Sequence, residues 1–366
     1  MEPLPKVLFF VSCFGCGLTA LLTEMTCSLQ GHTGERLLCV TSETEQFPGL
    51  FDRLKCVGVG FRIVKGLDAH GDFGRLLTEF CQLIEEFNPD VVQVQSNWQL
   101  ILAVRARTRC RSLFRIAYWV HGYRHNEPLK SVLATAIIGS ALALWADRVI
   151  VNSSCVRRRF RFLGGKLRQI SLGVDRSLLY AFQPPNYGSK PKRLIFPGQF
   201  RRGKNQAWLI QALADYCRQT GDREVELVLP GAGDSLNECK HLAERLNVGG
   251  LVCFPGQVSR NQIIEAYLKS QVAIIPSNYE TFGSCIAEPL ALGRIVLSRP
   301  VGCAEDLIVH GENGFLFSSK QELQELLIRV LPDLSRYRRV GEQARELRSK
   351  FDWDRIAGEY CEILKR

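Results

Sequence analysis

The sequence predicts an α/β protein made of two doubly wound domains, each built on a parallel sheet. Short runs of β-branched and apolar residues alternate with helical patterns along the whole chain, as in parallel sheets rather than sandwiches or helix bundles. The 366 residues are 46% hydrophobic and 23% charged, which is enough to build two domains with separate cores. The same fractions exclude a disordered, collagen-like or fibrous chain.

The predicted strands form two series with helices between them. The first series occupies residues 6–12, 36–41, 57–64, 91–95, 114–120, 148–152 and 169–172. The second occupies residues 193–196, 225–229, 251–254, 272–276, 295–298 and 314–317. Between the two series, residues 182–192 carry three prolines and a Gly-Ser pair, as interdomain linkers do. We therefore expect domains at 1–183 and 184–351, followed by a final helix over 354–365.

The first apolar run, residues 7–22, is compatible with either a first β-strand or a secretory signal peptide. We expect the strand, because Gly15 and Gly17 interrupt the run and no small-residue cleavage site follows it. The other long apolar stretch, residues 131–145, is shorter than the roughly 20 residues that a membrane-spanning helix needs, so no span is predicted.

Fourteen cysteines are scattered through the chain, mostly singly and in apolar runs. This distribution favours reduced thiols and a cytoplasmic location over a disulfide framework. Cys13 and Cys16 form a CxxC pair, but no second CxxC and no histidine pair at zinc-finger spacing accompanies it. We interpret the pair as part of a strand-to-loop turn, with a zinc site as the alternative.

Positive charge is concentrated in the middle of the chain. Residues 1–100 hold 7 Lys and Arg against 12 Asp and Glu, residues 101–183 hold 15 against 3, and residues 184–366 hold 25 against 22. The excess gathers in Arg105, Arg107, Arg109, Arg111 and Arg115, and again in Arg157, Arg158, Arg159, Arg161, Lys166 and Arg168. These runs predict an anionic partner such as a membrane surface or a phosphorylated acceptor, with a merely solvated face as the alternative.

Ligands of open α/β sheets bind beyond the carboxyl ends of the strands, so the chemistry should lie in the loops that follow the second series. In the loop after residue 276, Glu280 precedes Glu288 by eight residues, and Glu288 lies about two turns into a helix that opens near Gly283. Backbone N–H groups at a helix start favour phosphate, and two carboxylates can accept hydrogen bonds from sugar diols. The pattern therefore predicts a nucleotide-sugar site.

These motifs resemble the retaining glycosyltransferases of family four, which have the GT-B fold: two Rossmann-like domains facing a central cleft. The resemblance rests on the E-x7-E element of Glu280 and Glu288 followed by PLALG, and on GCAEDLIVHGENGFLF further along. Upstream, FPGQFRRGKNQ, LVLPGAGDS and VCFPGQVS appear in the family's order. In the first half, WVHGY, RVIVNSS and SLGVD do so too, so the resemblance covers nearly the whole chain.

The resemblance implies a role for each matching residue. Glu280 would contact hydroxyls of the transferred sugar, Glu288 the nucleotide ribose, and Lys204 the diphosphate. His121 would face the donor sugar across the cleft, so His121, Lys204 and Glu280 are the expected catalytic residues. The family usually has arginine where this chain has Gln199, which leaves Arg201 as the expected second cation. The other expected donor-binding residues are Gly15, Gly17, Gln199, Gly231, Gly233, Val258, Thr281, Phe282, Gly283 and Ser284.

The implied activity is metal-independent transfer of a hexosyl unit from a nucleoside diphosphate sugar to an acceptor hydroxyl. Asp352 and Asp354 form the chain's Asp-x-Asp triplet, and we expect them to cap the last helix rather than hold a metal. That helix, residues 352–366, is expected to pack back onto the first domain. No cofactor is expected besides the donor.

We expect the acceptor to be a saccharide or lipid-linked saccharide, used in cell-surface polysaccharide, lipopolysaccharide or glycolipid biosynthesis. Residues 101–183 would dock on an anionic membrane, which predicts a cytoplasmic enzyme on the inner face of the cell membrane. One alternative is an epimerase or phosphorylase with the same fold. A nucleic-acid-binding module is disfavoured, because only Phe160 and Phe162 interleave with the arginines.

Overall fold

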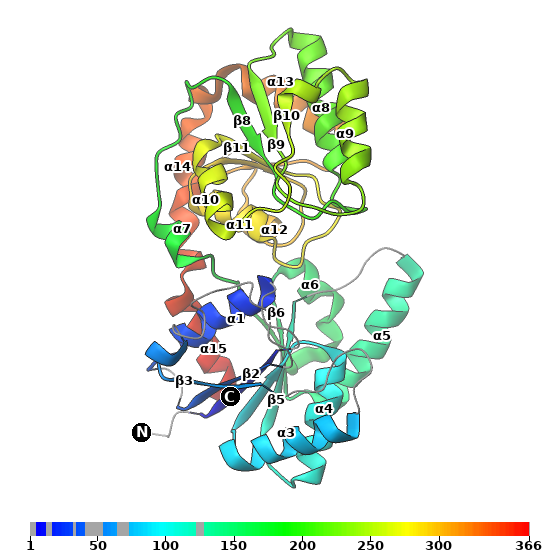
Figure 1. The fold of residues 1–366 in the computed structure, drawn as a ribbon, viewed down its shortest axis with the longest axis vertical. Helices are drawn as coiled ribbons and strands as arrows, with labels where there is room; N and C mark the ends of the chain where they lie inside the picture. Colours follow the sequence, from blue (N-terminus) through cyan, green and yellow to red (C-terminus); the bar gives the residue numbers. More distant parts are fainter. Residues whose placement is uncertain are drawn as a thin grey trace. The chain divides into compact units, whose positions relative to one another are not determined.

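The computed structural model describes residues 5–11, 17–31, 34–40, 54–63, 73–121 and 128–365 (Figure 1). The chain divides into two compact units. The first unit comprises Met1–Gly173 together with Asp352–Arg366, and the second comprises Val174–Phe351. Each unit is built on a sheet whose described strand pairs are all parallel, as the alternating sequence pattern predicts.

The sheet of the first unit has seven strands in the order β3-β2-β1-β4-β5-β6-β7. The strands are β1 (Val7–Val11), β2 (Arg36–Val40), β3 (Val59–Ile63), β4 (Val91–Val94), β5 (Arg115–Val120), β6 (Arg148–Val151) and β7 (Leu167–Gln169). All five residues of β1 are hydrophobic and buried, as expected for a strand covered on both faces. The last strand was predicted at 169–172, but it begins two residues earlier and ends three residues earlier, because β6 pairs with Leu167–Gln169.

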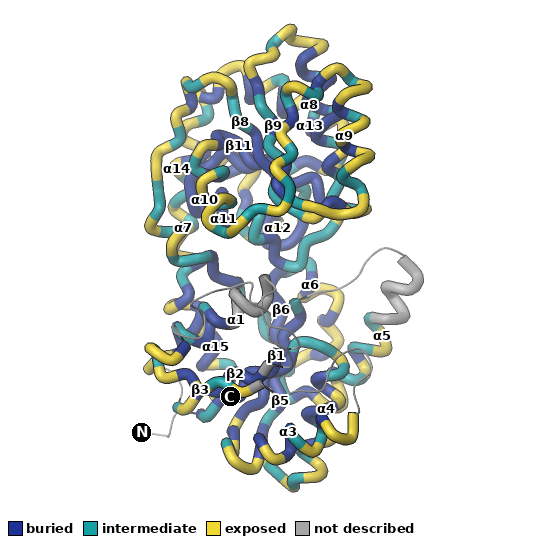
Figure 2. The backbone as a smooth tube through the Cα atoms, in the orientation of Figure 1, coloured by how far each residue is buried: buried dark blue, intermediate teal, exposed yellow. Residues whose placement is uncertain are grey.

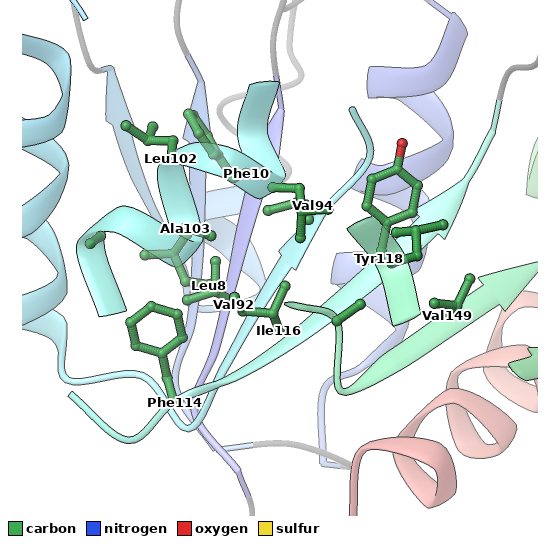
Figure 3. Packing of buried hydrophobic residues seen from close by; sticks show 14 of the residues in the cluster. Leu8, Phe10, Val92, Val94, Leu102, Ala103, Phe114, Ile116, Tyr118 and Val149 are labelled. Carbon is green, nitrogen blue, oxygen red and sulfur yellow. The ribbon is translucent and has the colours of Figure 1, made fainter. Parts of the chain in front are cut away.

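Helices connect these strands and cover the sheet. They are α1 (Gly17–Ser28), α3 (Phe73–Phe87), α4 (Asn97–Arg109), α5 (Pro128–Trp145), α6 (Ser154–Arg159) and the 3-10 helix η1 (Arg161–Lys166). Figure 3 shows the core between α4 and the sheet, where Leu102 and Ala103 lie over Leu8, Val92 and other strand residues. Figure 2 shows the same layering along the backbone: the strands are buried, and the helices are exposed on one side.

The C-terminal helix α15 (Trp353–Lys365) belongs to the first unit. Trp353 is almost completely buried, and a Cβ at Gly173 would lie 2.4 Å from its ring, so only glycine fits at that position. Further along the helix, Tyr360 stacks on Trp119 with ring centroids 5.5 Å apart. The hydroxyl of Tyr360 donates a hydrogen bond to Gln93 in β4. Aromatic packing therefore fixes α15 to the centre of the first sheet.

The sheet of the second unit has six strands in the order β10-β9-β8-β11-β12-β13. The strands are β8 (Lys192–Ile195), β9 (Val225–Val228), β10 (Val252–Cys253), β11 (Val272–Ile275), β12 (Ile295–Ser298) and β13 (Phe315–Leu316). The helices are α7 (Arg176–Tyr180), α8 (Gln206–Thr220), α9 (Leu236–Arg245), α10 (Arg260–Lys269), α11 (Ser284–Ala291), α12 (Ala304–Leu307), α13 (Lys320–Val330) and α14 (Arg338–Glu346).

The boundary between the units lies after Gly173, not at the predicted residue 183. The segment between these positions contains α7, whose N-cap Asp175 lies 3.3 Å from Arg260 of the second unit. This ion pair attaches the segment to the second unit, and no sequence pattern near residue 183 reveals it.

Two sequence predictions concern cysteines and membrane segments. The twelve cysteines in the described part of the chain are free thiols, as predicted, whereas Cys13 and Cys16 lie outside it. Within the described ranges, no helix combines the length and apolar character needed to cross a bilayer.

Replacing Trp353 with Ala should destabilise the first unit by about 3–5 kcal/mol, because it leaves a cavity under α15 that the surroundings cannot fill. Urea unfolding followed by circular dichroism would show a lower midpoint. The exposed Tyr180 provides the control, since Tyr180→Ala removes an aromatic ring that is 84% exposed and should leave the midpoint nearly unchanged. Equal effects of the two substitutions would contradict the role of Trp353.

Candidate functional site

The strand order of the second sheet places two diverging loops side by side. β8 and β11 are neighbours, with Leu194 opposite Val272, yet β8 leads to β9 on one side and β11 leads to β12 on the other. Ligands of open α/β sheets bind in the crevice between such loops. Lys204 lies in the loop that follows β8, and Glu280 lies in the loop that follows β11.

Two glycines allow the loop after β9 to press against the loop after β8. Gly231 and Gly233 have φ angles of 145° and 144°, and a Cβ on Gly231 would lie 2.0 Å from the carbonyl oxygen of Gly198. The N–H groups of Gly198 and Phe200 donate 2.9 Å hydrogen bonds to the opposite loop. These predicted site glycines are therefore required for the close approach of two backbones.

Lys204 and Glu280 form a largely buried ion pair. Lys204 Nζ lies 2.5 Å from Glu280 Oε1, and the two side chains are 13% and 12% exposed. The neighbouring Asn205 has a left-handed backbone with φ of 59°, and its Nδ2 donates 2.7 Å hydrogen bonds to the Pro276 carbonyl and to Asn278 Oδ1. These bonds hold the two loops together, so the fold itself brings two predicted catalytic residues into contact.

The helix α11 begins next to this ion pair. Its N-cap Gly283 has φ of 87°, and Cys285 in its first turn lies with Sγ 3.8 Å from Glu280 Oε1. The preceding loop is held by a 2.7 Å hydrogen bond from the N–H of Cys303 to the carbonyl of Phe282. The Phe282 ring is buried, so only its backbone is available to a ligand. The positive end of the helix dipole therefore lies beside Lys204, and both favour an anion there.

Glu288 lies in the second turn of α11 and is paired with a residue that the sequence analysis missed. Its Oε1 lies 2.8 Å from Arg260 Nη1, and Arg260 Nε lies 3.3 Å from Asp175 Oδ2. Burial raises the pKa of Glu288, whereas Arg260 and the hydroxyl of Tyr267 lower it. The charge on this buried carboxylate therefore depends on Arg260. The sequence feature that could have identified Arg260 is its position at the start of a helix that follows one of the site loops.

Arg299 is a second residue that the sequence analysis missed. It directly follows β12, and its Nη1 lies 2.5 Å from Asn278 Oδ1, which in turn bonds Asn205. The predicted second cation, Arg201, and the neighbouring Gln199 have exposed side chains. Arg299 is therefore held within the loop network of Lys204. Among the described residues, Arg201 contributes only its backbone carbonyl, which accepts a 3.1 Å hydrogen bond from the N–H of Lys204.

The other predicted donor-binding residues of the second unit lie in the expected loops. Thr281 precedes Phe282, Ser284 is the first residue of α11, and Val258 is half-buried two residues before α10. In the C-terminal segment of the first unit, Asp352 Oδ1 accepts a 2.8 Å hydrogen bond from the N–H of Asp354, as a helix cap does. Among the described residues, no group of three or more His, Cys, Asp or Glu side chains could hold a metal ion.

Three predicted site residues belong to the first unit. His121 directly follows β5, and its ring stacks on Trp119 with centroids 5.1 Å apart. Burial lowers the pKa of His121 to about 3, so its imidazole is neutral at pH 7. Gly17 is the first residue of α1, and Gly15 lies outside the described residues.

Family models match both halves of the chain. Residues 24–173 match the model described as glycosyl transferase 4-like domain, and residues 181–347 match the model described as glycosyl transferases group 1. A D-inositol 3-phosphate glycosyltransferase of Catenulispora acidiphila is 26% identical over 243 residues, which are 60% of this chain and 56% of that protein. An uncharacterized glycosyltransferase of Methanocaldococcus jannaschii is 29% identical over 48% of this chain and 45% of its own length. The chain thus spans about half the length of these curated relatives.

Solved structures resemble the chain over almost its full length. HepE of Anabaena, solved with UDP and glucose, has a TM-score of 0.79 at 21% identity and covers 99% of both chains. A sucrose-phosphate synthase from Thermosynechococcus elongatus has a TM-score of 0.77 at 18% identity and covers 99% of this chain and 98% of its own. At these identities the likeness establishes the fold, and it confirms the two-domain α/β architecture predicted from the sequence.

Replacing Arg260 with Met should destabilise the second unit by about 3–5 kcal/mol at pH 7, because it leaves Glu288 buried without a partner. The pKa of Glu288, already raised by burial, would rise further, so the folded chain would bind a proton that the unfolded chain releases. The loss of stability should therefore grow as pH increases from about 4 to 8, and urea unfolding at several pH values would measure it.

The double variant Arg260→Met/Glu288→Gln is the control for this experiment. It removes both charges, so its stability should recover towards that of the unmodified chain, and the additional pH dependence seen in Arg260→Met should disappear. A loss of stability that is the same at every pH would show that Arg260 does not act through Glu288.

Proposed function

Because the chain belongs to the group 1 glycosyltransferases, we propose that it transfers a hexosyl unit from a nucleoside diphosphate sugar to an acceptor hydroxyl. The observation that carries this proposal is the buried pair of Lys204 and Glu280 beside the start of α11. A sugar diphosphate has negative charge for the lysine and the helix dipole, and hydroxyl groups for the carboxylate.

Each polar group of the site has a role in donor binding. Glu280 accepts hydrogen bonds from the sugar, Lys204 and the first N–H groups of α11 bind the diphosphate, and Glu288 binds the ribose diol. Arg260 supports Glu288, since its positive charge favours the ionised carboxylate, which can only accept hydrogen bonds. Anabaena HepE was also solved with UDP-glucose, which makes UDP the first nucleotide to test.

We propose that the anomeric configuration is retained, as family membership supports. The bond between the anomeric carbon and the diphosphate oxygen breaks, a bond to the acceptor oxygen forms on the same face, and the acceptor proton passes to the departing phosphate. The charge that develops on the leaving group is met by Lys204 and the α11 dipole, so the reaction is proposed to need no metal. His121, being neutral, contributes hydrogen bonding rather than positive charge.

The first unit is proposed to bind a saccharide or lipid-linked saccharide acceptor and to dock on an anionic membrane, which places the enzyme in surface polysaccharide or glycolipid synthesis. Ile137 and Leu144, seven residues apart on one face of α5, are 70% and 74% exposed. Phe162 packs over Gly139 of the same helix and is 56% exposed. An apolar ridge of this kind beside the exposed arginines of α6 suits insertion among anionic headgroups.

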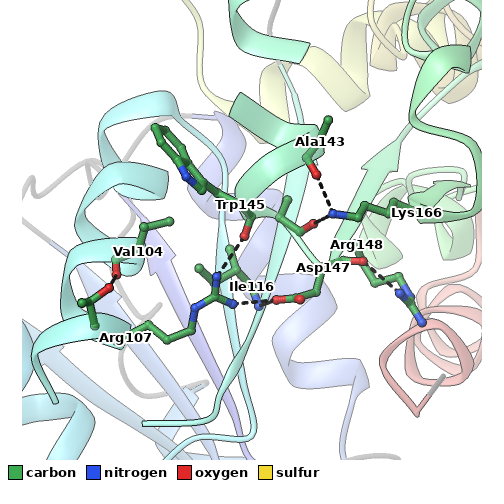
Figure 4. A network of polar contacts seen from close by, with 10 residues as sticks. Val104, Arg107, Ile116, Ala143, Trp145, Asp147, Arg148 and Lys166 are labelled. Atoms are coloured by element: carbon green, nitrogen blue, oxygen red, sulfur yellow. Dashed lines mark hydrogen bonds and ion pairs between the residues drawn. The ribbon is translucent and has the colours of Figure 1, made fainter. Parts of the chain in front are cut away.

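Fewer basic side chains are available for docking than the sequence suggests, because two of them bind within the first unit (Figure 4). Lys166 Nζ donates hydrogen bonds of 2.6 and 2.9 Å to the carbonyls of Ala143 and Ala146 at the end of α5. Arg107 Nη1 lies 3.0 Å from Asp147 Oδ2. These two cations stabilise the first unit. The arginines that are exposed, and that we propose to face a membrane, are Arg105, Arg109, Arg111, Arg157, Arg158, Arg159 and Arg161.

An epimerase or phosphorylase with the same fold is the second candidate. A phosphorylase would require inorganic phosphate as a substrate, and an epimerase would return an isomerised nucleotide sugar without an acceptor. Product analysis with and without phosphate distinguishes both from a transferase.

Thermal-shift measurements with UDP, GDP and ADP should identify one nucleotide that stabilises the chain, by about 2.7 kcal/mol at 100 times its dissociation constant. Glu288→Ala should abolish this shift, because the ribose loses its acceptor. Glu265→Ala, on the exposed side of α10, is the matched control and should keep the shift. An unchanged shift in Glu288→Ala would contradict the assigned role.

The double variant Ile137→Glu/Leu144→Glu should bind anionic vesicles at least tenfold more weakly, because it places charges where apolar side chains would insert. Co-sedimentation with phosphatidylcholine vesicles containing 30% phosphatidylglycerol would measure the binding. Val309→Glu, at an exposed apolar position of the second unit, is the control. Equal binding by all three proteins would contradict docking through α5.

A further inference from the structure

The second unit contains a cavity of about 660 Å³ that is separate from the loops of Lys204 and Glu280. Its wall includes Gly293, which lies two residues before the amino end of β12, whereas Lys204 and Glu280 follow the carboxyl ends of β8 and β11. Since these strands are parallel, the two places lie at opposite edges of the sheet. The rest of the wall comes from segments 182–187 and 338–349, and the volume is typical of small-molecule sites.

Close backbone packing builds one side of this cavity. The Tyr187 hydroxyl donates a 3.1 Å hydrogen bond to the carbonyl of Gly293. A Cβ on Gly341 of α14 would lie 2.2 Å from that hydroxyl oxygen and 2.5 Å from the carbonyl oxygen, so only glycine fits there. Gly293 has φ of 66°, which glycine adopts without strain. The wall is therefore held in place by contacts within the fold.

The arginines that line the cavity are not paired with carboxylates. The guanidinium carbon of Arg345 lies 3.4 Å from the centroid of the Phe182 ring, and Arg345 Nε is buried without a hydrogen-bond partner. Burial lowers the pKa of Arg345, and the positive charge of Arg348 lowers it further. Within the described part of the chain, no ion pair joins Arg338, Arg345 or Arg348 to an acidic side chain. An anion beside them would offset their repulsion.

A fourth arginine is buried behind the wall. Arg294 is 0% exposed, and its Nη2 donates a 2.8 Å hydrogen bond to the carbonyl of Gln183, whose two neighbours in the chain line the cavity. Among the described residues, Arg294 Nε and Nη1 have no hydrogen-bond partner. Burial lowers the pKa of Arg294 to about 10, so the side chain is still charged at pH 7. Its charge therefore favours an anion in the adjoining cavity.

We infer that this cavity binds a nucleoside monophosphate, at a site separate from the donor site. The four arginines exceed the two glutamates of the cavity, Glu342 and Glu346, by two positive charges, which matches a phosphate group. Phe182 and Tyr187, together with two prolines, supply aromatic and apolar surface for a flat base. The glutamates accept hydrogen bonds from ribose hydroxyls or amino groups.

Other small anions match the cavity less well. Inorganic phosphate would leave most of its volume unfilled, and an uncharged nucleoside would leave the arginines without a counter-ion. A nucleoside triphosphate carries more negative charge than the two glutamates leave uncompensated. The site uses none of Lys204, Glu280 and Glu288, so this inference does not depend on the proposed function.

Isothermal titration calorimetry with AMP, GMP, CMP and UMP would test the inference. At least one monophosphate should bind, and its nucleoside and inorganic phosphate should each bind at least tenfold more weakly. Arg345→Met should weaken binding of the monophosphate at least tenfold, because it removes the guanidinium and keeps an unbranched side chain beside Phe182. Arg348→Met should also weaken it, and this exposed position can be substituted without disturbing the core.

The matched control is Arg329→Met. Its guanidinium also lies over a phenylalanine ring of the second unit, 5.4 Å from the centroid of Phe315, but outside the cavity, so binding should be unchanged. Glu288→Ala, at the donor site, should likewise keep monophosphate binding. Loss of binding in Glu288→Ala but not in Arg345→Met would place the nucleotide at the donor site and overturn the inference. So would absence of binding by every monophosphate, equal binding of inorganic phosphate alone, or equal affinities in all variants.

Discussion

Burial of charge is the constraint on which the site of the second unit depends. A carboxylate removed from water needs a cation or strong hydrogen bonds, and this chain buries two of them in one helix and the loop before it. Glu280 is paired with Lys204 and Glu288 with Arg260. Each pair joins segments that are distant in sequence, so the ion pairs hold the loops at the carboxyl ends of the strands in one arrangement.

In the first unit, the polar groups buried near the ends of the strands are uncharged. Its central strands are apolar, and the polar residues at their ends are amides and aromatic side chains with a polar atom. His121, Trp119 and Tyr360 stack in sequence, and the hydroxyl of Tyr360 reaches Gln93. The buried polar groups at the strand ends are thus mainly ions in the second unit and neutral hydrogen-bonding groups in the first.

Much of the candidate site could be predicted because its residues follow local rules. Glu280 and Glu288 were recognisable from their eight-residue spacing across a helix start, and the cap formed by Asp352 from its position before a helix. Lys204 was expected because its motif resembles that of the family. Arg260 and Arg299 were missed because their partners, Glu288 and Asn278, come from other loops, and nothing in the local pattern indicates such a pairing. Arg107 and Lys166 were assigned to a free basic surface for the same reason.

The sequence by itself determined the two-domain α/β architecture, the strand series and the loops that carry the chemistry, because hydrophobic periodicity and turn residues act over short distances. Only the tertiary structure decided which ions pair, that the first unit ends at Gly173, and that β7 begins at Leu167. It also showed which amide atoms of Gln93, Gln95 and Gln99 are buried without a hydrogen-bond partner. These features depend on contacts between segments far apart along the chain, and such contacts exist only once the sheets have formed.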